Sequence, residues 1–308
     1  MDVFSFMPSE EECAVVLRDV RWRDGVSCPR CGSRSVVRHG RHLGVYRRYI
    51  CRGCRRDFND RTGTLFEDSK LPLRVWFFSA FLMQYKVPVL EIAKTAQVSY
   101  PTAFNIAKRL RRGLYLSQLQ EKLKGIVELD EVYVTAGLKG KRGLKRPPRV
   151  RSLKARGRGT YTTDKPPIMG IVERGGTVKL TPSANMTGRT VLRRALNNIH
   201  EDAEAVYTDD YPAYNILDGY CNHQTVNHSL GQYARDGGIH TNTVEAEFSV
   251  FRPWMDTYRG ISKENLHLYT AQYNFLRNTR KEDRAKRATA MVAIHLTNME
   301  EDNYAPSA

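Results

Sequence analysis

Three acidic residues in the C-terminal two-thirds of the chain lie where a charge has little structural use. Asp130 is at the centre of residues 125–134, a β-prone apolar run, and Asp209 ends a second apolar run at residues 205–209. Glu245 follows 36 positions later, in residues 242–251, which have a helical pattern. Converging carboxylates suit hard divalent cations, and two such cations can clamp the attacking and leaving oxygens of a phosphoryl transfer.

Taken singly, each acid also has an ordinary structural explanation. Asp209 could begin a turn, Asp130 could cap a loop, and Glu245 could be a solvated helix residue. The order of the three acids, their spacing and the motifs that precede them favour the metal-binding interpretation.

Four of the six cysteines have the spacing of a zinc site. They form Cys28-Pro-Arg-Cys31 and Cys51-Arg-Gly-Cys54, with 19 residues between the pairs. A four-thiolate shell leaves no open position, so the Zn²⁺ would be structural. A disulfide framework is the alternative, which a chain without a secretory signal disfavours. Cys13 and Cys221 are left over as core or surface thiols.

Length and composition predict a multidomain globular protein with an anionic partner. The 308 residues give room for two or three domains, and 41% of them are hydrophobic. No run is long and apolar enough for a membrane span, and the N-terminus lacks a signal-peptide pattern, so we expect no membrane association. The formal charge of +16 favours a polyanion such as DNA, although charge alone also suits a ribosomal or membrane-surface protein.

A helical region separates the cysteines from the first acid. Residues 71–83 are apolar nearly all round and predict a buried helix. Residues 89–96, a turn at 97–99 and a basic helix at 100–112 have the pattern of a helix-turn-helix, with Ser99 as its N-cap. An ordinary helical hairpin is the alternative. The side chains expected to reach DNA are those of Thr102, Asn105, Lys108, Arg109, Arg111 and Arg112.

A basic insertion follows the first acidic strand. Residues 137–165 contain eleven Lys or Arg and a single acid, Asp164. Blocks of like charge are usually solvated, and phosphate is the counter-charge that DNA supplies. We therefore expect the insertion to contact nucleic acid.

The order of elements predicts an RNase H-like core. Strands are expected at residues 125–134, 167–173 and 177–181, then a helix near 189–199 and strands at 205–209 and 224–228. Three antiparallel strands, a helix and a fourth strand beside the first would place Asp130 and Asp209 on neighbouring strands. Long C-terminal helices complete the expected fold.

Several motifs together resemble one family, the ISXO-type insertion-sequence transposases, which join a zinc ribbon and a helix-turn-helix to a DDE-type catalytic domain. The resemblance runs from Cys28 to Arg280. The motifs that carry it are Cys28-Pro-Arg-Cys31, residues 63–73 with Trp76, and residues 128–133, 208–214, 240–245, 260–266 and 273–277.

The resemblance implies roles for particular residues. Asp130 and Asp209 match the first and second catalytic aspartates, and Glu245 the third acid. Asn242 competes with Glu245, because family members differ in which residue of Asn-x-x-Glu is the ligand. Arg252, two helical turns after Glu245, matches a basic residue near the DNA backbone.

Other acids nearby are weaker candidates for the same roles. Glu131 and Asp210 are the rivals beside the first two ligands, and Glu247 is a further acid near the third. His228 and His240 are close in sequence, but a lone histidine is more often a packing residue than a ligand.

The resemblance also implies an activity. The expected protein is a DNA transposase that binds terminal inverted repeats, cleaves the element ends with two Mg²⁺ or Mn²⁺ ions, and transfers the 3′ hydroxyl strand into target DNA. It would act as a homodimer or larger assembly in the nucleoid of a prokaryotic cytoplasm. The alternatives are a non-catalytic DNA-binding regulator and an RNase H-like structure-specific nuclease.

The expected organisation is an α/β multidomain chain in four parts. Residues 1–66 hold the zinc ribbon, at about 24–60, and residues 67–122 hold the helix-turn-helix. Residues 123–280 form the RNase H-like domain, and residues 281–308 form a C-terminal tail.

Overall fold

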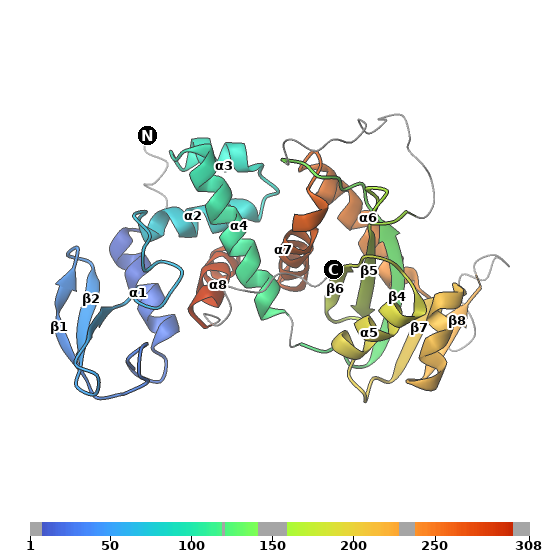
Figure 1. Ribbon diagram of the computed structural model, residues 1–308, viewed down its shortest axis with the longest axis horizontal. Coiled ribbons are helices and arrows are strands. Elements are labelled where there is room, and N and C mark those ends of the chain that lie inside the picture. The colour runs from blue at the N-terminus through green and yellow to red at the C-terminus, as the bar shows by residue number, and fades with distance from the viewer. Residues whose placement is uncertain (1–7, 119–120, 141–158, 228–237, 298–308) are drawn as a thin grey trace. The chain divides into compact units, whose positions relative to one another are not determined.

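The computed structural model describes residues 8–118, 121–140, 159–227 and 238–297 (Figure 1). The described residues up to Ser117 and from Lys281 onward form one compact unit, the N-terminal unit. Those from Gln118 to Arg280 form a second, the sheet unit. Most of the basic insertion (141–158) and the candidate His228 lie outside the described residues.

The N-terminal unit combines a small antiparallel sheet, in the order β1-β2-β3, with five helices among the described residues. Its elements are α1 (Glu10–Arg21), β1 (Val36–His42), β2 (Tyr46–Cys51), β3 (Asp57–Asn59), α2 (Leu73–Met83), α3 (Val89–Thr95), α4 (Tyr100–Ser117) and α8 (Arg284–Thr297).

Two acids, the buried Asp60 and the half-buried Glu10, join the elements of this unit. Asp60 accepts hydrogen bonds from Arg18 Nη2 at 2.9 Å and from the Arg47 amide at 2.7 Å, which links α1 to β2. Glu10 of α1 accepts from the amides of Leu73 and Arg74 at 2.8 and 3.0 Å. The N-cap of α2, Pro72, offers no side-chain cap, so Glu10 satisfies the first amides of that helix instead.

Helices α3 and α4 form the expected helix, turn and helix. Ser99 Oγ accepts from the Thr102 amide at 3.3 Å, as an N-cap does. The prediction of an exposed Arg111 is wrong: its side chain is buried, because it lies on the inner face of α4, one turn after Ala107. Asn105, Lys108 and Arg109 are exposed.

The predicted C-terminal tail contains helix α8, which packs against α1, α2 and α4. Ala288, Met291 and Val292 are buried in this packing. At the beginning of α8, the Arg284 carbonyl accepts from Gln84 Nε2 at 2.9 Å. The core of the N-terminal unit is thus built from both ends of the chain.

The sheet unit contains a five-stranded sheet in the order β6-β5-β4-β7-β8. Its elements are β4 (Ile126–Tyr133), β5 (Pro167–Glu173), β6 (Val178–Pro182), α5 (Gly188–Asn198), β7 (Ala205–Asp209), η2 (Pro212–Gly219), β8 (His223–Val226), α6 (Asn242–Asp256), η4 (Lys263–Asn265) and α7 (Leu266–Asn278). Strands β4, β5 and β6 are antiparallel, and β7 pairs in parallel with β4 and β8. This order confirms the predicted RNase H-like fold.

Alternating side chains give the sheet two apolar faces. Val132, Val172 and Leu180 pack with α6 and α7 on one face, and Val127 and Leu129 pack with α5 and η2 on the other. Figure 1 shows these helices on either side of the strands.

Helix α6 lies very close to the sheet at Gly170. This glycine pairs with Asp130 in the β4–β5 ladder. A Cβ at Gly170 would lie 2.7 Å from Phe248 and Val244 of α6, closer than real Cβ contacts allow. Only a residue without a side chain lets the helix approach β5 at this point, directly beside Asp130 of β4.

The two ends of the basic insertion are anchored beside the segment that follows α6. Lys139 Nζ donates to the Gly260 carbonyl at 2.9 Å. Lys263 Nζ donates to Asp164 Oδ1 at 3.1 Å, and both side chains of this ion pair are nearly buried. The single acid of the insertion thus has a structural partner.

Replacing Gly170 with Ala should destabilise the protein by about 1–3 kcal/mol, because the added methyl overpacks the contact with α6. Urea unfolding measures the effect. Gly219→Ala is the matched control, since a Cβ there meets nothing within 4 Å. Equal stability of the two variants would show that α6 does not need this close approach.

Candidate functional site

Asp130 and Asp209 lie at equivalent positions on neighbouring strands. The parallel register pairs Ile126 with Ala205 and Glu128 with Tyr207, and two further residues along each strand lead to the two aspartates. Ala205 and Tyr207 pack on the same face as Ile126, which is also the face toward α6. The strand order thus brings the two carboxylates to one side of the sheet.

Helix α6 brings the third group of candidates to this face. Asn242, Glu245 and Arg252 are all exposed, and their spacings put them on one side of the helix. The Thr241 hydroxyl, at the N-cap, donates to Glu245 Oε1 at 3.2 Å and orients that side chain.

The pKa of Asp130 depends on burial and on the neighbouring acids. Burial raises the pKa of the Asp130 carboxyl to about 8, and the Glu131 amide, which donates to Asp130 Oδ1 at 2.7 Å, only partly opposes this. The charges of Glu131, Asp209 and Glu245 raise the pKa of Asp130 further. A bound cation would offset this repulsion between carboxylates. Carboxylate oxygens are the ligands that Mg²⁺ and Mn²⁺ prefer.

The other acids have different surroundings. Glu247 is buried, and its carboxylate pairs with Arg277 Nη2 at 2.6 Å and accepts from Tyr273 Oη at 3.1 Å, so it joins α6 to α7. Glu131 accepts from the buried Tyr214 Oη at 2.8 Å, on the α5 side of the sheet. Asp210 is exposed beside Asp209.

Hydrogen bonds fix the end of β7, where Asp209 stands. Asp209 Oδ1 accepts from the Tyr211 amide at 3.2 Å, so this side chain also makes the turn that its sequence allowed. Thr208 Oγ1 lies 2.9 Å from His223 Nε2, and His223 Nδ1 lies 2.6 Å from Asp218 Oδ1. This chain of contacts ties β7 to β8 just before Asp209.

Glu128 lies in the motif at residues 128–133, but no sequence rule assigns it a role. Its carboxylate is fully buried, and His240 Nδ1 lies 3.2 Å from its Oε1, so His240 packs against an acid. The close contact of Gly170 with α6 was also not predicted. A glycine inside an apolar strand is the one signal that could have marked a close helix approach.

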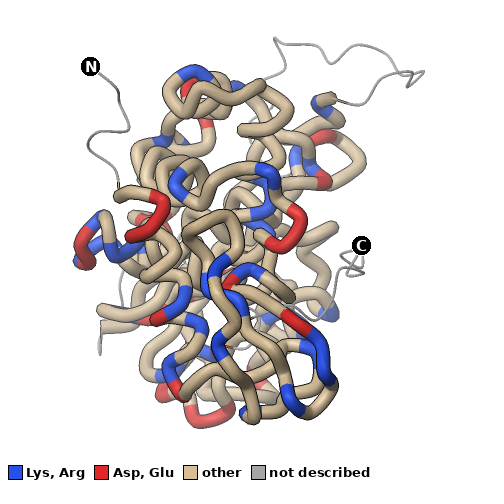
Figure 2. The backbone as a smooth tube through the Cα atoms, turned by 90° about the vertical axis from the view of Figure 1, so that its left-hand side faces the viewer, with Lys and Arg blue, Asp and Glu red and all other residues tan. Residues whose placement is uncertain are grey.

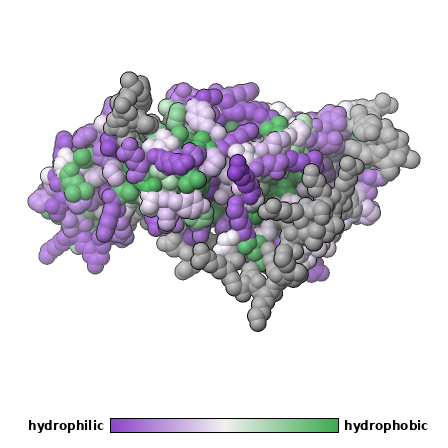
Figure 3. All heavy atoms as spheres, turned by 90° about the horizontal axis from the view of Figure 1, so that it is seen from above, coloured by the Kyte–Doolittle hydropathy of each residue, from purple (hydrophilic) through white to green (hydrophobic). Residues whose placement is uncertain are grey.

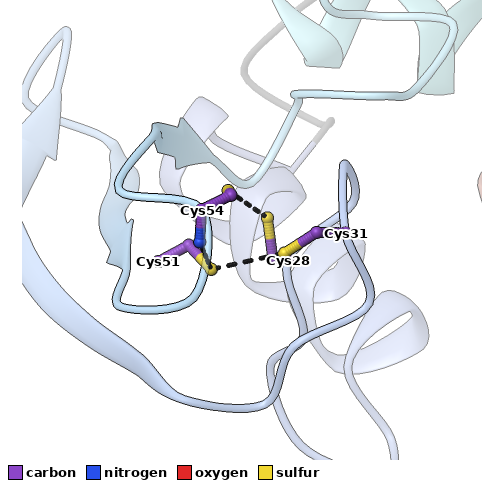
Figure 4. Close-up of side chains that lie close together, drawn as sticks. All are labelled: Cys28, Cys31, Cys51 and Cys54. Atoms are coloured by element: carbon purple, nitrogen blue, oxygen red, sulfur yellow. Dashed lines mark hydrogen bonds between the residues drawn. The ribbon is translucent and has the colours of Figure 1, made fainter.

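The four predicted zinc ligands converge in the N-terminal unit (Figure 4). All four sulfurs lie within 4.8 Å of one another, and Cys31 Sγ and Cys51 Sγ are 3.6 Å apart. Tetrahedral zinc with bonds of about 2.3 Å needs sulfurs about 3.8 Å apart, so this geometry supports a structural Zn²⁺. The Cys54 amide, which donates to Cys51 Sγ, lowers the pKa of that thiol to about 6.

Replacing Cys28 with Ser should remove the zinc and lower the melting temperature, because the ribbon sheet is joined to α1 through Asp60. Metal analysis should find one zinc per wild-type chain. Cys221→Ser, a thiol change outside the cluster, should keep it. Full zinc occupancy in Cys28→Ser would rule out this ligand set.

Replacing Asp130 with Asn should stabilise the metal-free protein at high pH. The unfolded-state pKa is about 3.9, and the fold raises it, so wild-type stability is greatest below about pH 4 and falls as the pH rises through 8. Asn stays neutral, so its advantage in thermal unfolding should grow from pH 4 to pH 8. Asp210→Asn, at an exposed position, should lack this trend. An advantage independent of pH would contradict the raised pKa.

Comparison with known proteins follows the same division of the chain. The model of the ISXO2-like transposase domain matches residues 122–278, and that of the transposase zinc-ribbon domain matches residues 8–57. A protein of Halobacterium salinarum, named "Uncharacterized protein in transposable element ISH50", is 37% identical over 272 residues, which is 87% of this chain and 91% of that protein.

Solved structures give weaker matches. The pre-cleavage Mos1 transpososome is 14% identical with a TM-score of 0.28, covering 76% of this chain and 80% of its own. The Mos1 strand transfer complex is 12% identical with a TM-score of 0.29, covering 76% and 79%. Scores this low carry no weight, and the fold rests on the strand order. The domain match covers just over half of the chain and the halobacterial protein most of it, so the chain belongs to the ISXO2-like transposase family and carries its zinc ribbon.

Proposed function

We propose that this protein is a DNA transposase that binds the terminal inverted repeats of an insertion sequence and cleaves the phosphodiester at its ends. The freed 3′ hydroxyl strand is then joined to target DNA. The observation that carries the proposal is the placement of Asp130 and Asp209 on neighbouring strands, with Glu245 on α6 near enough that the charges of Asp209 and Glu245 help raise the pKa of Asp130.

In this proposal Asp130 and Asp209 are metal ligands from the sheet, and Glu245 is the third, from α6. Two divalent ions held there, Mg²⁺ or Mn²⁺, would supply Lewis-acid stabilisation of charge on the phosphodiester oxygens. Two observations support Glu245 over Asn242: the Glu245 charge reaches Asp130, and the Thr241 hydroxyl holds its carboxylate.

The protein's own side chains position the DNA at this centre. Arg252 lies on the same exposed side of α6 as Glu245, where its guanidinium can hold a backbone phosphate. Lys139 and Lys263 anchor the two ends of the basic insertion next to the end of α6. The insertion is proposed to add further contacts to the DNA backbone.

Recognition of the inverted repeats is assigned to the N-terminal unit. Helices α3 and α4 are proposed as a helix-turn-helix whose exposed Asn105, Lys108 and Arg109 read or hold DNA. Residues 28–56, which include β1 and β2, contain nine arginines and no acid, and Figure 2 shows blue positions recurring there. Arginine without competing acids suits phosphate and guanine contacts.

Among the described residues, no helix is both long and apolar enough to cross a bilayer. On the face seen in Figure 3, hydrophobic patches are small and broken up by hydrophilic ones. We propose action in the nucleoid of a prokaryotic cytoplasm, as a homodimer or larger assembly that pairs two element ends.

Asp130→Asn and Asp209→Asn should each abolish cleavage of a labelled duplex that carries the inverted repeats, while repeat binding stays at wild-type affinity. Each change removes a charged metal ligand without altering the N-terminal unit. Cleavage is measured with Mg²⁺ or Mn²⁺, with EDTA as the control, and binding by footprinting. Asp210→Asn is the matched control and should cut normally.

The same assay separates the rival assignments. Glu245→Gln should lose cleavage and Asn242→Ala should keep most of it; the reverse would make Asn242 the third ligand. Repeat-specific binding without nicking by wild-type protein would point to a non-catalytic regulator. Nicking that follows DNA structure rather than the repeats would point to a repair-type nuclease.

A further inference from the structure

Helix α6 begins without a cap of its own. The first amides of a helix lack partners within it and are usually satisfied by an N-cap side chain. The N-cap residue here, Thr241, makes no such bond, and its hydroxyl is directed to Glu245 instead. The helix that carries Glu245 and Asn242 therefore needs a partner from elsewhere in the fold.

Glu128 of β4 is that partner. Its Oε2 accepts from the amides of Thr243 and Val244 at 2.7 and 3.1 Å, and its Oε1 accepts from Thr243 Oγ1 at 2.8 Å. A carboxylate at a helix N-terminus also interacts favourably with the helix dipole. One fully buried side chain thus fixes the N-terminus of α6 against the sheet.

Arg174 completes this anchor. Its Nε donates to Glu128 Oε1 at 2.6 Å, and its other nitrogens donate to the carbonyls of Gly238 and His240 at 2.7 and 3.0 Å. Its guanidinium lies over the Tyr207 ring, 4.9 Å from the centroid. Arg174 and Glu128 together therefore bind both the segment before α6 and the first turn of the helix.

The position of Glu128 in the chain links this anchor to the candidate site. Glu128 and Asp130 are two residues apart on one strand, so their side chains share a face of the sheet. On the helix, Val244 is bound by Glu128 and is followed directly by Glu245. The Glu128 carboxylate thus joins β4, two residues before Asp130, to the α6 residue that directly precedes Glu245.

We propose that Glu128 is a positioning residue of the catalytic centre, which holds α6 so that Glu245 lies at the correct distance from Asp130 for divalent cations. The inference rests on the proposed function of the same site. It assigns to Glu128 a role in cation affinity that packing alone would not require.

Glu247 provides a matched control on the same helix. It is also a buried glutamate paired with an arginine, Arg277, but it joins α6 to α7 and binds no helix-terminal amide. Glu128→Gln and Glu247→Gln each remove one buried negative charge from a carboxylate that anchors α6, the first on β4 and the second on the helix itself. A purely structural role for Glu128 predicts that both variants lose stability and that neither changes cation binding.

The test is Mn²⁺ binding by full-length protein that keeps its structural zinc but is free of other divalent cations, followed by electron paramagnetic resonance without DNA. We expect Glu128→Gln to weaken Mn²⁺ binding about tenfold or more, as loss of a residue that supports metal ligands typically does, and Glu247→Gln to leave it unchanged. Thr243→Val, which keeps the buried ion pair, should shift the affinity in the same direction by less. This variant decides the test if Glu128→Gln does not fold.

Equal Mn²⁺ affinity in wild type, Glu128→Gln and Thr243→Val overturns the inference, as does an equal loss in Glu128→Gln and Glu247→Gln. The readout is independent of cleavage. A protein whose Mn²⁺ binding depends on Asp130 and Glu128 but which never cuts repeat DNA would overturn the proposed function and uphold the positioning role.

Discussion

The contact between α6 and the sheet is the constraint on which the candidate site depends. A strand and a helix have rigid backbones, so acids carried on them keep a fixed separation only if the two elements are held together. Gly170 removes the side chain that would keep them apart, and the buried Glu128 and Arg174 pair bonds the helix where it starts. Close packing and a shared ion pair thus hold α6 against the sheet.

Local sequence patterns predicted much of the fold. The alternation in residues 125–134, 167–173 and 205–209 was enough to place strands, and their order implied that Asp130 and Asp209 would be neighbours. The cysteine spacing likewise implied the cluster that the structure contains. These features were accessible because each depends on residues close together in sequence or on a topology with few alternatives.

Long-range partners were not accessible in this way. Glu128 and Glu10 each cap a helix that begins far away in the chain, whereas capping rules examine only adjacent residues. Arg111 was predicted to reach DNA and Glu247 was a weaker candidate for the third acid, because charged side chains are usually exposed. Both side chains are buried. Helix α8 was missed because the surface that it covers is formed by the opposite end of the chain.

The contribution of α8 to the N-terminal unit has a consequence for biosynthesis. Residues 8–117 leave the ribosome before α8, so their core lacks Met291 and Val292 until α8 has been translated. The sheet unit, continuous in sequence, can fold during elongation, whereas the unit proposed to read DNA matures last. A nascent chain therefore completes its sheet unit before its N-terminal unit, so the DNA binding proposed for the N-terminal unit must wait for α8.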